Sequence, residues 1–215
     1  DISFLMEQGF LTEKKKISSI KHYETDTLKD LYMYNMGNVI LQVTQNCNLR
    51  CEYCVYSGSY INRVHTNKRM SFETAVKTID FLAAHSLNCN EVSIGFYGGE
   101  PLLEIELIKK AVSYAKEVFG EKKVNFNMTT NATLLNMDIA DFLVQNDFNI
   151  TISLDGPRNI HNKNRIFANS NKGTFDLIME NIALIREKYP FFDKKISFNA
   201  VIDLKQNVSC TNEFF

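Results

Sequence analysis

From Val39 onward, the sequence alternates between segments with the pattern of β-strands and segments with the pattern of α-helices. Such alternation is typical of βα units that build a parallel sheet. The predicted strands cover residues 39–44, 91–97, 123–129, 148–154 and 195–202. Helices are predicted from an N-cap at Ser71 onward, from Ile108 to a stop at Gly120, over about 136–145, and from an N-cap at Thr174 to Pro190. We therefore expect an α/β fold.

Several predicted strands are polar on one face, whereas a parallel sheet covered by helices is normally apolar on both faces. In the third strand, Val124, Phe126 and Met128 alternate with Asn125, Asn127 and Thr129. The fourth and fifth strands alternate in the same way. A polar face suits neighbouring parallel strands if the sheet curves into a barrel or part-barrel with a wet lumen. An antiparallel sheet with one face in water is the alternative.

Composition limits the classes of partner and compartment. The chain has 215 residues, 45% of them hydrophobic, which suffices for the core of one large domain. A formal net charge of -1 provides no basic field for nucleic acid or an anionic membrane. No apolar run approaches the roughly 20 residues of a membrane span, and no signal-peptide pattern opens the sequence. We expect a cytoplasmic protein without a nucleic-acid or membrane partner.

The chain has five cysteines, and three of them lie in one short stretch directly after the first predicted strand. Cys47, Cys51 and Cys54 have the spacing C-x3-C-x2-C, among polar and charged neighbours. A structural zinc site uses four protein ligands, whereas an iron–sulfur cluster held by three cysteines leaves one iron open. The pattern indicates a metal site in a reducing compartment, and a zinc knuckle or a redox Cys-x-x-Cys remains an alternative. Cys89 and Cys210 stand alone and are expected to be small hydrophobes.

The stretch Cys-Asn-Leu-Arg-Cys-Glu-Tyr-Cys, residues 47–54, resembles the cluster-binding loop of the radical S-adenosylmethionine (SAM) enzymes. The resemblance implies a [4Fe-4S] cluster on Cys47, Cys51 and Cys54, with SAM bound to the open iron through its amino and carboxyl groups. It also implies a partial (β/α)6 barrel of the TIM type, here truncated after the fifth strand. An electron donor such as flavodoxin or ferredoxin would be a partner.

Further motifs follow the other predicted strands, and in βα barrels the loops at the carboxyl ends of the strands share one mouth. Gly98-Gly99-Glu100-Pro101 resembles the family's GGEP motif, in which backbone and carboxylate take up the SAM amino group. The resemblance places Tyr53 beside the adenine of SAM. It gives Asn131, Ser153 and Arg165 polar contacts with the ribose and carboxylate.

Asp155 follows the fourth predicted strand in the sequence Ser-Leu-Asp-Gly. We predict that it binds substrate or accepts a proton, as a catalytic residue. His161 could support the site from behind, and an exposed loop histidine is the alternative.

The stretch 152–157 with Ile160-His161 and Arg165, together with Arg69-Met70-Ser71, resembles the radical SAM/SPASM enzymes. These are anaerobic sulfatase-maturing enzymes and the maturases that install thioether or carbon–carbon crosslinks in ribosomally made peptides. The cysteine-rich C-terminal domain of that group is absent from this sequence. The resemblance implies reductive cleavage of SAM and abstraction of a hydrogen from a bound peptide, which then acquires a thioether or other crosslink. The alternatives are a maturase that forms formylglycine and, in another class, a zinc-binding adaptor without enzymatic activity.

Two parts of the chain are predicted. Residues 38–215 would form an incomplete radical SAM core, and residues 1–37 a separate N-terminal segment. Residues 4–11, Phe-Leu-Met-Glu-Gln-Gly-Phe-Leu, resemble the end of the small modules that recognise leader peptides before such enzymes. An amphipathic segment that packs on the main domain is the alternative.

Overall fold

A computed structural model describes residues 1–10, 19–57, 64–203 and 208–215. Its core is one sheet of five parallel strands in sequence order, with β1 and β5 at the two edges. The strands are β1 (Asn38–Thr44), β2 (Glu91–Gly98), β3 (Lys123–Thr130), β4 (Asn149–Ser153) and β5 (Ile196–Asn199). The predicted α/β class is confirmed, and the antiparallel alternative is wrong. The fifth strand is shorter than the predicted 195–202.

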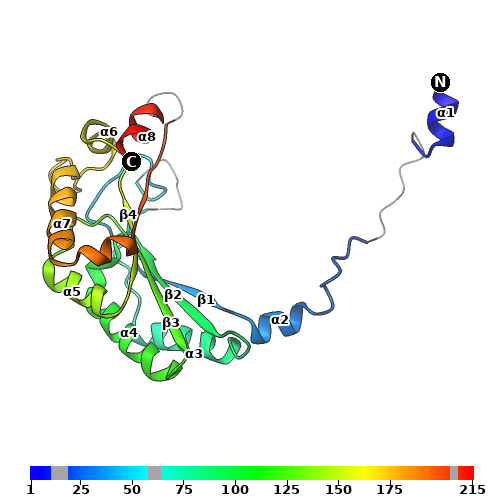
Figure 1. Cartoon of the computed structure of the whole chain (residues 1–215), viewed down its shortest axis with the longest axis horizontal. Helices are drawn as coiled ribbons and strands as arrows, with labels where there is room; N and C mark the ends of the chain where they lie inside the picture. Colours follow the sequence, from blue (N-terminus) through cyan, green and yellow to red (C-terminus); the bar gives the residue numbers. More distant parts are fainter. Residues whose placement is uncertain (11–18, 58–63, 204–207) are drawn as a thin grey trace.

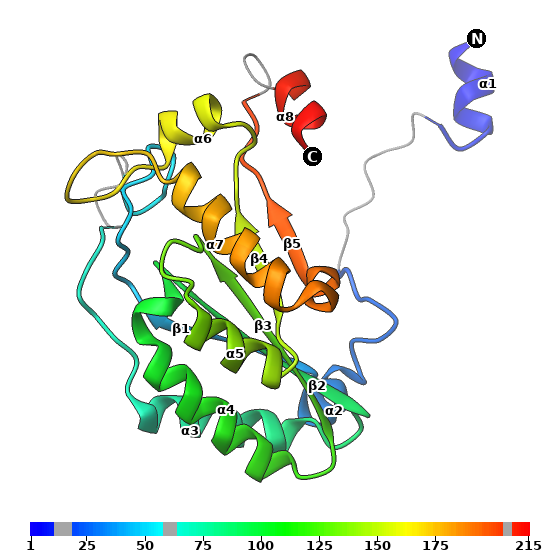
Figure 2. The ribbon, with the colours of Figure 1, turned by 60° about the vertical axis from the view of Figure 1, so that its left-hand side comes forward.

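The four predicted helices are present and cover one face of the sheet, as Figure 2 shows. They are α3 (Phe72–His85), α4 (Ile105–Phe119), α5 (Met137–Gln145) and α7 (Phe175–Lys188). The Ser71 hydroxyl caps α3 by accepting from the backbone N–H of Thr74. Gly120 ends α4 with φ of +56°, a conformation that favours glycine.

The prediction for Thr174 is half right. Thr174 occupies the N-cap position of α7, but its side chain makes no capping hydrogen bond, because its hydroxyl is engaged with His161 and with the backbone of Arg165. Short elements that the sequence analysis did not predict are η1 (Pro101–Glu104), α6 (Arg158–Asn164), η2 (Pro190–Lys195) and α8 (Val208–Phe214).

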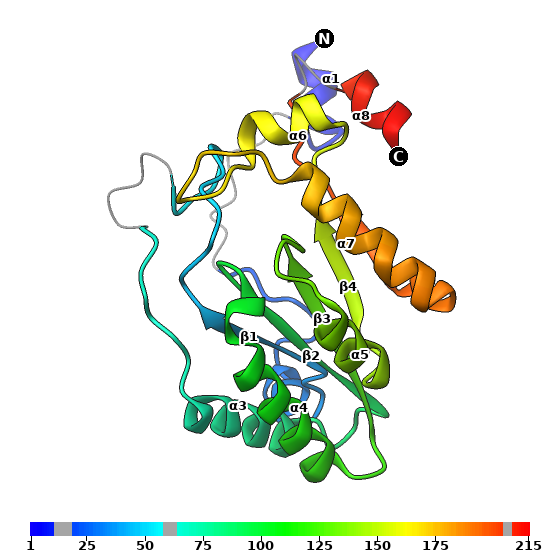
Figure 3. The same ribbon diagram turned by 90° about the vertical axis from the view of Figure 1, so that its left-hand side faces the viewer.

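The helix-covered face of the sheet holds the hydrophobic core. Phe96, Phe126 and Phe148 stack there with ring centroids 5.4 to 6.5 Å apart, and all three are almost fully buried. Such a packed aromatic cluster fixes the relative positions of β2, β3 and the start of β4. The carboxyl ends of these strands are therefore held at one edge of the sheet, towards α6 and α8 in Figure 3.

The opposite face of the sheet lines a hollow of about 290 Å³, and the predicted polar side chains, among them Asn127, Asn149 and Thr151, contribute to its lining. Asn127 donates to the Ser93 hydroxyl over 2.7 Å between β3 and β2. Ile40 and Tyr97 also reach this face and are 65% and 51% exposed. The lumen is therefore polar along β3 and β4 and partly apolar along β1 and β2.

The described residues before β1 fall into two parts, 1–10 and 19–37. The segment with α2 (Leu28–Tyr34) is joined to the core, because the N–H of Met36 donates to His85 and the N–H of Asn88 donates to Tyr34. Helix α1 (Ile2–Glu7) has no buried residue and lies apart from the sheet in Figure 1. A role of this segment in leader-peptide binding stays a prediction. Among the described residues, no helix combines the length and apolarity needed to cross a membrane.

Candidate active site

The carboxyl ends of the strands surround a pocket of about 340 Å³. The cysteine loop after β1 forms one side of it, and the ends of β2, β3, β4 and β5 form the others. All but two of the predicted site residues line this pocket. The residues that line it are Cys47, Cys51, Tyr53, Cys54, Gly98, Gly99, Asn131, Ser153 and Arg165. The two exceptions, Glu100 and Asp155, are fully buried behind its wall.

The cysteine loop is held by a segment more than 100 residues later in the chain. The N–H of Arg50 donates to Ile166 over 2.9 Å, and the N–H of Ala168 donates to Asn48 over 2.9 Å. These backbone hydrogen bonds act like a short antiparallel ladder and fix the path of the loop. Arg165, at the start of the segment, is thereby placed in the pocket beside the cysteines.

The three cysteines of the loop are free thiols that line the same pocket. Burial raises the pKa of the Cys47 thiol to about 12, and burial also raises the pKa of Cys51. A bound metal centre reverses this effect, because its positive charge stabilises the thiolate. In the described parts of the chain, no three His, Cys, Asp or Glu side chains converge on a single metal ion.

Gly98 and Gly99 bring the end of β2 against the backbone of the cysteine loop. Gly98 has φ of +149°, and a Cβ there would overlap the carbonyl oxygen of Thr44. A Cβ on Gly99 would overlap the carbonyl oxygen of Asn46. The N–H groups of Gly99 and Glu100 donate to those two carbonyls over 3.0 and 2.9 Å. The glycines thus permit a close contact between backbones, in addition to lining the pocket.

The carboxylate of Glu100 joins the ends of β2 and β3. One oxygen accepts from the Thr130 hydroxyl over 2.6 Å and from the N–H of Leu102 over 3.0 Å. The other accepts from the N–H of Asn131 over 2.7 Å. Burial raises the pKa of this carboxyl to about 7, although the three hydrogen bonds oppose the rise. Glu100 has no exposed surface in this arrangement, and the predicted contact with the SAM amino group stays a prediction.

Asp155 connects three parts of the fold through its carboxylate. Oδ2 accepts from the Tyr53 hydroxyl over 2.6 Å and lies 3.1 Å from Nε of Arg165, as an ion pair. Oδ1 accepts from the N–H of Val201 over 3.1 Å. Asp155 has no exposed surface, and its predicted role in binding substrate or accepting a proton stays a prediction. Its contacts position Tyr53 and Arg165, whose guanidinium lies 5.4 Å from the Tyr53 ring centroid.

His161 supports the site from behind, as predicted. Its Nδ1 accepts from the backbone N–H of Asp155 over 3.3 Å, so Nε2 carries the proton and donates to the Thr174 hydroxyl over 2.9 Å. Thr174 in turn donates to the carbonyl of Arg165 over 3.1 Å. Burial, with Arg165 nearby, lowers the pKa of His161 to about 4. The neutral imidazole therefore links the backbones of Asp155 and Arg165.

Three residues of the site were not predicted: Asn48 and Thr133, which contact Asn131, and His65, which lines the pocket. Asn48 and Thr133 could have been suspected, since each lies beside a motif residue. His65 gave no sequence signal.

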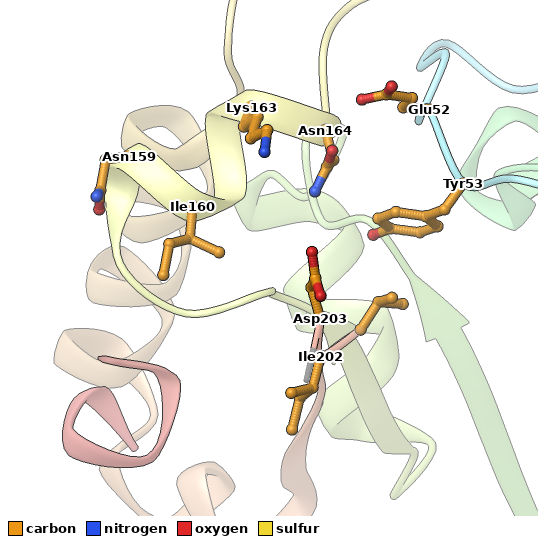
Figure 4. A pocket seen from close by; sticks show the side chains of 9 residues that line it. Glu52, Tyr53, Asn159, Ile160, Lys163, Asn164, Ile202 and Asp203 are labelled. Atoms are coloured by element: carbon orange, nitrogen blue, oxygen red, sulfur yellow. The ribbon is translucent and has the colours of Figure 1, made fainter. Parts of the chain in front are cut away.

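A further hollow, of about 610 Å³, adjoins the cysteine pocket, and Tyr53 and Val201 line both of them. Figure 4 shows Tyr53 on one side of it, Ile160 and Lys163 of α6 on another, and Ile202 below. Tyr53 therefore separates the cysteine pocket from a groove between the cysteine loop and α6.

Comparison with known proteins identifies the family. The sequence model of the Radical SAM superfamily matches residues 41–213. The chain belongs to this superfamily.

The relatives include sulfatase-maturating enzymes and a cyclopropyl synthase. A cysteine-type anaerobic sulfatase-maturating enzyme of Clostridium novyi is 33% identical over 82% of this chain and 46% of its own length. The radical SAM cyclopropyl synthase TigE of Paramaledivibacter caminithermalis is 24% identical over 96% of this chain and 47% of its own length. The solved structure of native anSMEcpe with bound AdoMet has a TM-score of 0.69 and 27% identity, covering 83% of this chain and 48% of that one.

The chain spans about half the length of these relatives. The fold is therefore the partial radical SAM barrel predicted from the sequence. The family consists of enzymes, so the zinc-binding adaptor is not supported.

Membership of the superfamily implies a [4Fe-4S] cluster and SAM as cofactors. The residues present fit both. Three free thiols line the pocket, and thiolates are the usual ligands of such clusters. The Arg165 guanidinium lies beside them, and its planar set of N–H donors suits a carboxylate.

Replacing Gly99 with alanine should separate the end of β2 from the cysteine loop, because the added methyl group overlaps backbone and not a movable side chain. We expect Gly99→Ala to destabilise the cluster-free protein by about 1–3 kcal/mol in urea unfolding, as overpacking does, and to lower its iron content after reconstitution. Gly37→Ala is the matched control, since a Cβ there meets nothing closer than Cys89 Sγ at 3.8 Å. Wild-type stability and iron content in Gly99→Ala would contradict this role.

Replacing Glu100 with glutamine should destabilise the protein before any cofactor binds. In either orientation of the new amide, the N–H of Leu102 or of Asn131 faces an NH2 group and loses its acceptor. A buried donor without a partner costs about 1–3 kcal/mol, to be measured by urea unfolding of the cluster-free protein. Unchanged stability together with weaker SAM binding would instead show that the carboxylate reaches SAM.

Proposed function

We propose that this chain is the cofactor-binding part of a radical SAM maturase that installs a thioether or other crosslink in a ribosomally made peptide. The observation that carries the proposal is the continuity of the cysteine pocket with the lumen. Tyr97 and Thr129 line both hollows, so a substrate in the lumen would lie next to the cofactors. A lumen that offers both polar groups and apolar surface beside the pocket suits a peptide segment, which carries backbone amides and side chains of both kinds.

The pocket residues would divide the binding of SAM between them. The Arg165 guanidinium would hold the carboxylate, and the backbone of Gly98 and Gly99 would lie at the amino group. Asn131 and Ser153 would contact the ribose, and Tyr53 would contact the adenine. When bound, the cluster and SAM supply the reductive cleavage that generates a radical able to abstract hydrogen from the substrate.

The lumen would bind the peptide through its amide and hydroxyl groups. Ser93, Asn127, Asn149 and Thr151 offer donors and acceptors that can pair with a peptide backbone. Ile40 and Tyr97 offer apolar surface for a side chain. A filled lumen would also exclude water from the reacting atoms.

The second candidate is a maturase that converts a cysteine or serine of a sulfatase to formylglycine. It is favoured by the 33% identity to the sulfatase-maturating enzyme of Clostridium novyi and by the solved structure of anSMEcpe with AdoMet and the Cp18Cys peptide, which has a TM-score of 0.68. The crosslinking maturase is favoured by the match to TigE over almost the whole chain. Either enzyme would need an electron donor, for which flavodoxin and ferredoxin are our candidates.

Mass spectrometry of a peptide that contains cysteine but no serine distinguishes the candidates. The full-length protein that contains this chain should be incubated with SAM, reductant and peptide under anaerobic conditions. We expect 5′-deoxyadenosine and a peptide that loses two hydrogen atoms but keeps its sulfur, as a thioether requires. Loss of the sulfur would establish the formylglycine maturase instead.

The control is a pair of cysteine variants. Cys54→Ala should abolish both products, whereas Cys210→Ala should leave them unchanged, because Cys210 is exposed on α8 and outside the pocket. Peptide modification by Cys54→Ala at the wild-type rate would contradict the proposal.

A further inference from the structure

Asn131 belongs to a closed ring of hydrogen bonds that includes the cysteine loop. Its Nδ2 donates to Oδ1 of Asn48 over 2.9 Å, and Nδ2 of Asn48 donates to the Thr133 hydroxyl over 2.8 Å. The Thr133 hydroxyl donates to Oδ1 of Asn131 over 2.7 Å and closes the ring. Asn48 lies directly after Cys47, so the ring ties the first cysteine of the motif to the end of β3.

The ring also fixes the direction in which the Asn131 amide points. The backbone N–H of Thr133 donates to Oδ1 of Asn131 over 3.0 Å, and a backbone N–H can only donate. The atom that faces Thr133 must therefore be the oxygen, and the NH2 group must face the cysteine loop. The backbone of Asn131 is held as well, because its N–H donates to Glu100.

The NH2 group of Asn131 then has a second hydrogen available beside Cys47. Its Nδ2 lies 3.8 Å from Cys47 Sγ, within hydrogen-bond distance of sulfur, and the N–H of Leu49 lies 3.4 Å from the same sulfur. Asn131 is 6% exposed, so water competes little for these contacts. No other side-chain amide donates to a cysteine sulfur among the hydrogen bonds of the described residues.

We propose that Asn131 is a positioning residue for the cluster ligand Cys47, held in place by Asn48 and Thr133, and that its amide N–H tunes the cluster's reduction potential. Hydrogen bonds to ligand sulfurs stabilise the more negative, reduced state of an iron–sulfur cluster. This role is separate from the contact with the ribose of SAM proposed above for Asn131, because it acts before SAM binds. It depends on the cluster and not on the substrate proposed above.

The test is the midpoint potential of the reconstituted full-length protein without SAM, from a redox titration followed by electron paramagnetic resonance (EPR). Asn131→Asp keeps the acceptor for Thr133 but replaces the NH2 group with an oxygen. Thr133→Val removes the hydroxyl of the ring without changing any charge. We expect both variants to be harder to reduce, with the reduced-to-oxidised ratio at a fixed potential lowered by up to about tenfold, or about 59 mV for one electron.

Thr133→Ser is the matched control, because it keeps the hydroxyl and should keep the wild-type potential. SAM affinity is measured on the same samples by calorimetry. Wild-type potentials in Asn131→Asp and Thr133→Val would overturn the proposal. If these variants also bound SAM more weakly, contact with SAM would be the role of Asn131. If Asn131→Asp does not take up a cluster, the comparison of Thr133→Val with Thr133→Ser decides the question. A lower potential in Thr133→Val than in Thr133→Ser supports the proposal, and equal potentials overturn it.

Discussion

The cofactor pocket depends on the buried carboxylate of Glu100. Its hydrogen bonds to Thr130 and Asn131 join the ends of β2 and β3, and the two glycines before it let β2 touch the cysteine loop. A buried charged or polar group is costly unless its hydrogen bonds are made, so the ends of these strands have little freedom to separate. Cysteines, glycines and Asn131 therefore keep fixed relative positions before any cofactor arrives.

A second buried carboxylate performs the same task on the other side of the pocket. Asp155 joins the cysteine loop to β4 and to the chain after β5 through Tyr53 and Val201. Its ion pair with Arg165 keeps the guanidinium beside the cysteines. The two acidic residues closest to the site thus hold other residues in place, and the surfaces offered to ligand belong to thiols, amides, hydroxyls and one guanidinium.

Much of the fold and of the pocket could be predicted from the sequence. Parallel topology brings the carboxyl ends of strands to one edge, so motifs such as Gly98-Gly99 and Ser153 had to meet the cysteine loop. The direction of a side chain was not predictable, because a residue at a strand end can face the pocket or turn away from it. Glu100 and Asp155 turn away from it and are fully buried. Partners distant in sequence were also missed: Asn48 and Thr133 lie near motif residues, but nothing in the sequence shows that they hydrogen bond to each other across 85 positions.

EPR of the reduced cluster, recorded before and after SAM is added, tests most directly whether the pocket holds a [4Fe-4S] cluster with one iron open to SAM. The full-length protein that contains this chain is reconstituted and reduced under anaerobic conditions. We predict a [4Fe-4S]+ signal that changes shape on addition of SAM and is lost in Cys51→Ala. A signal that SAM leaves unchanged, or one stoichiometric zinc ion in place of iron, would contradict the assignment.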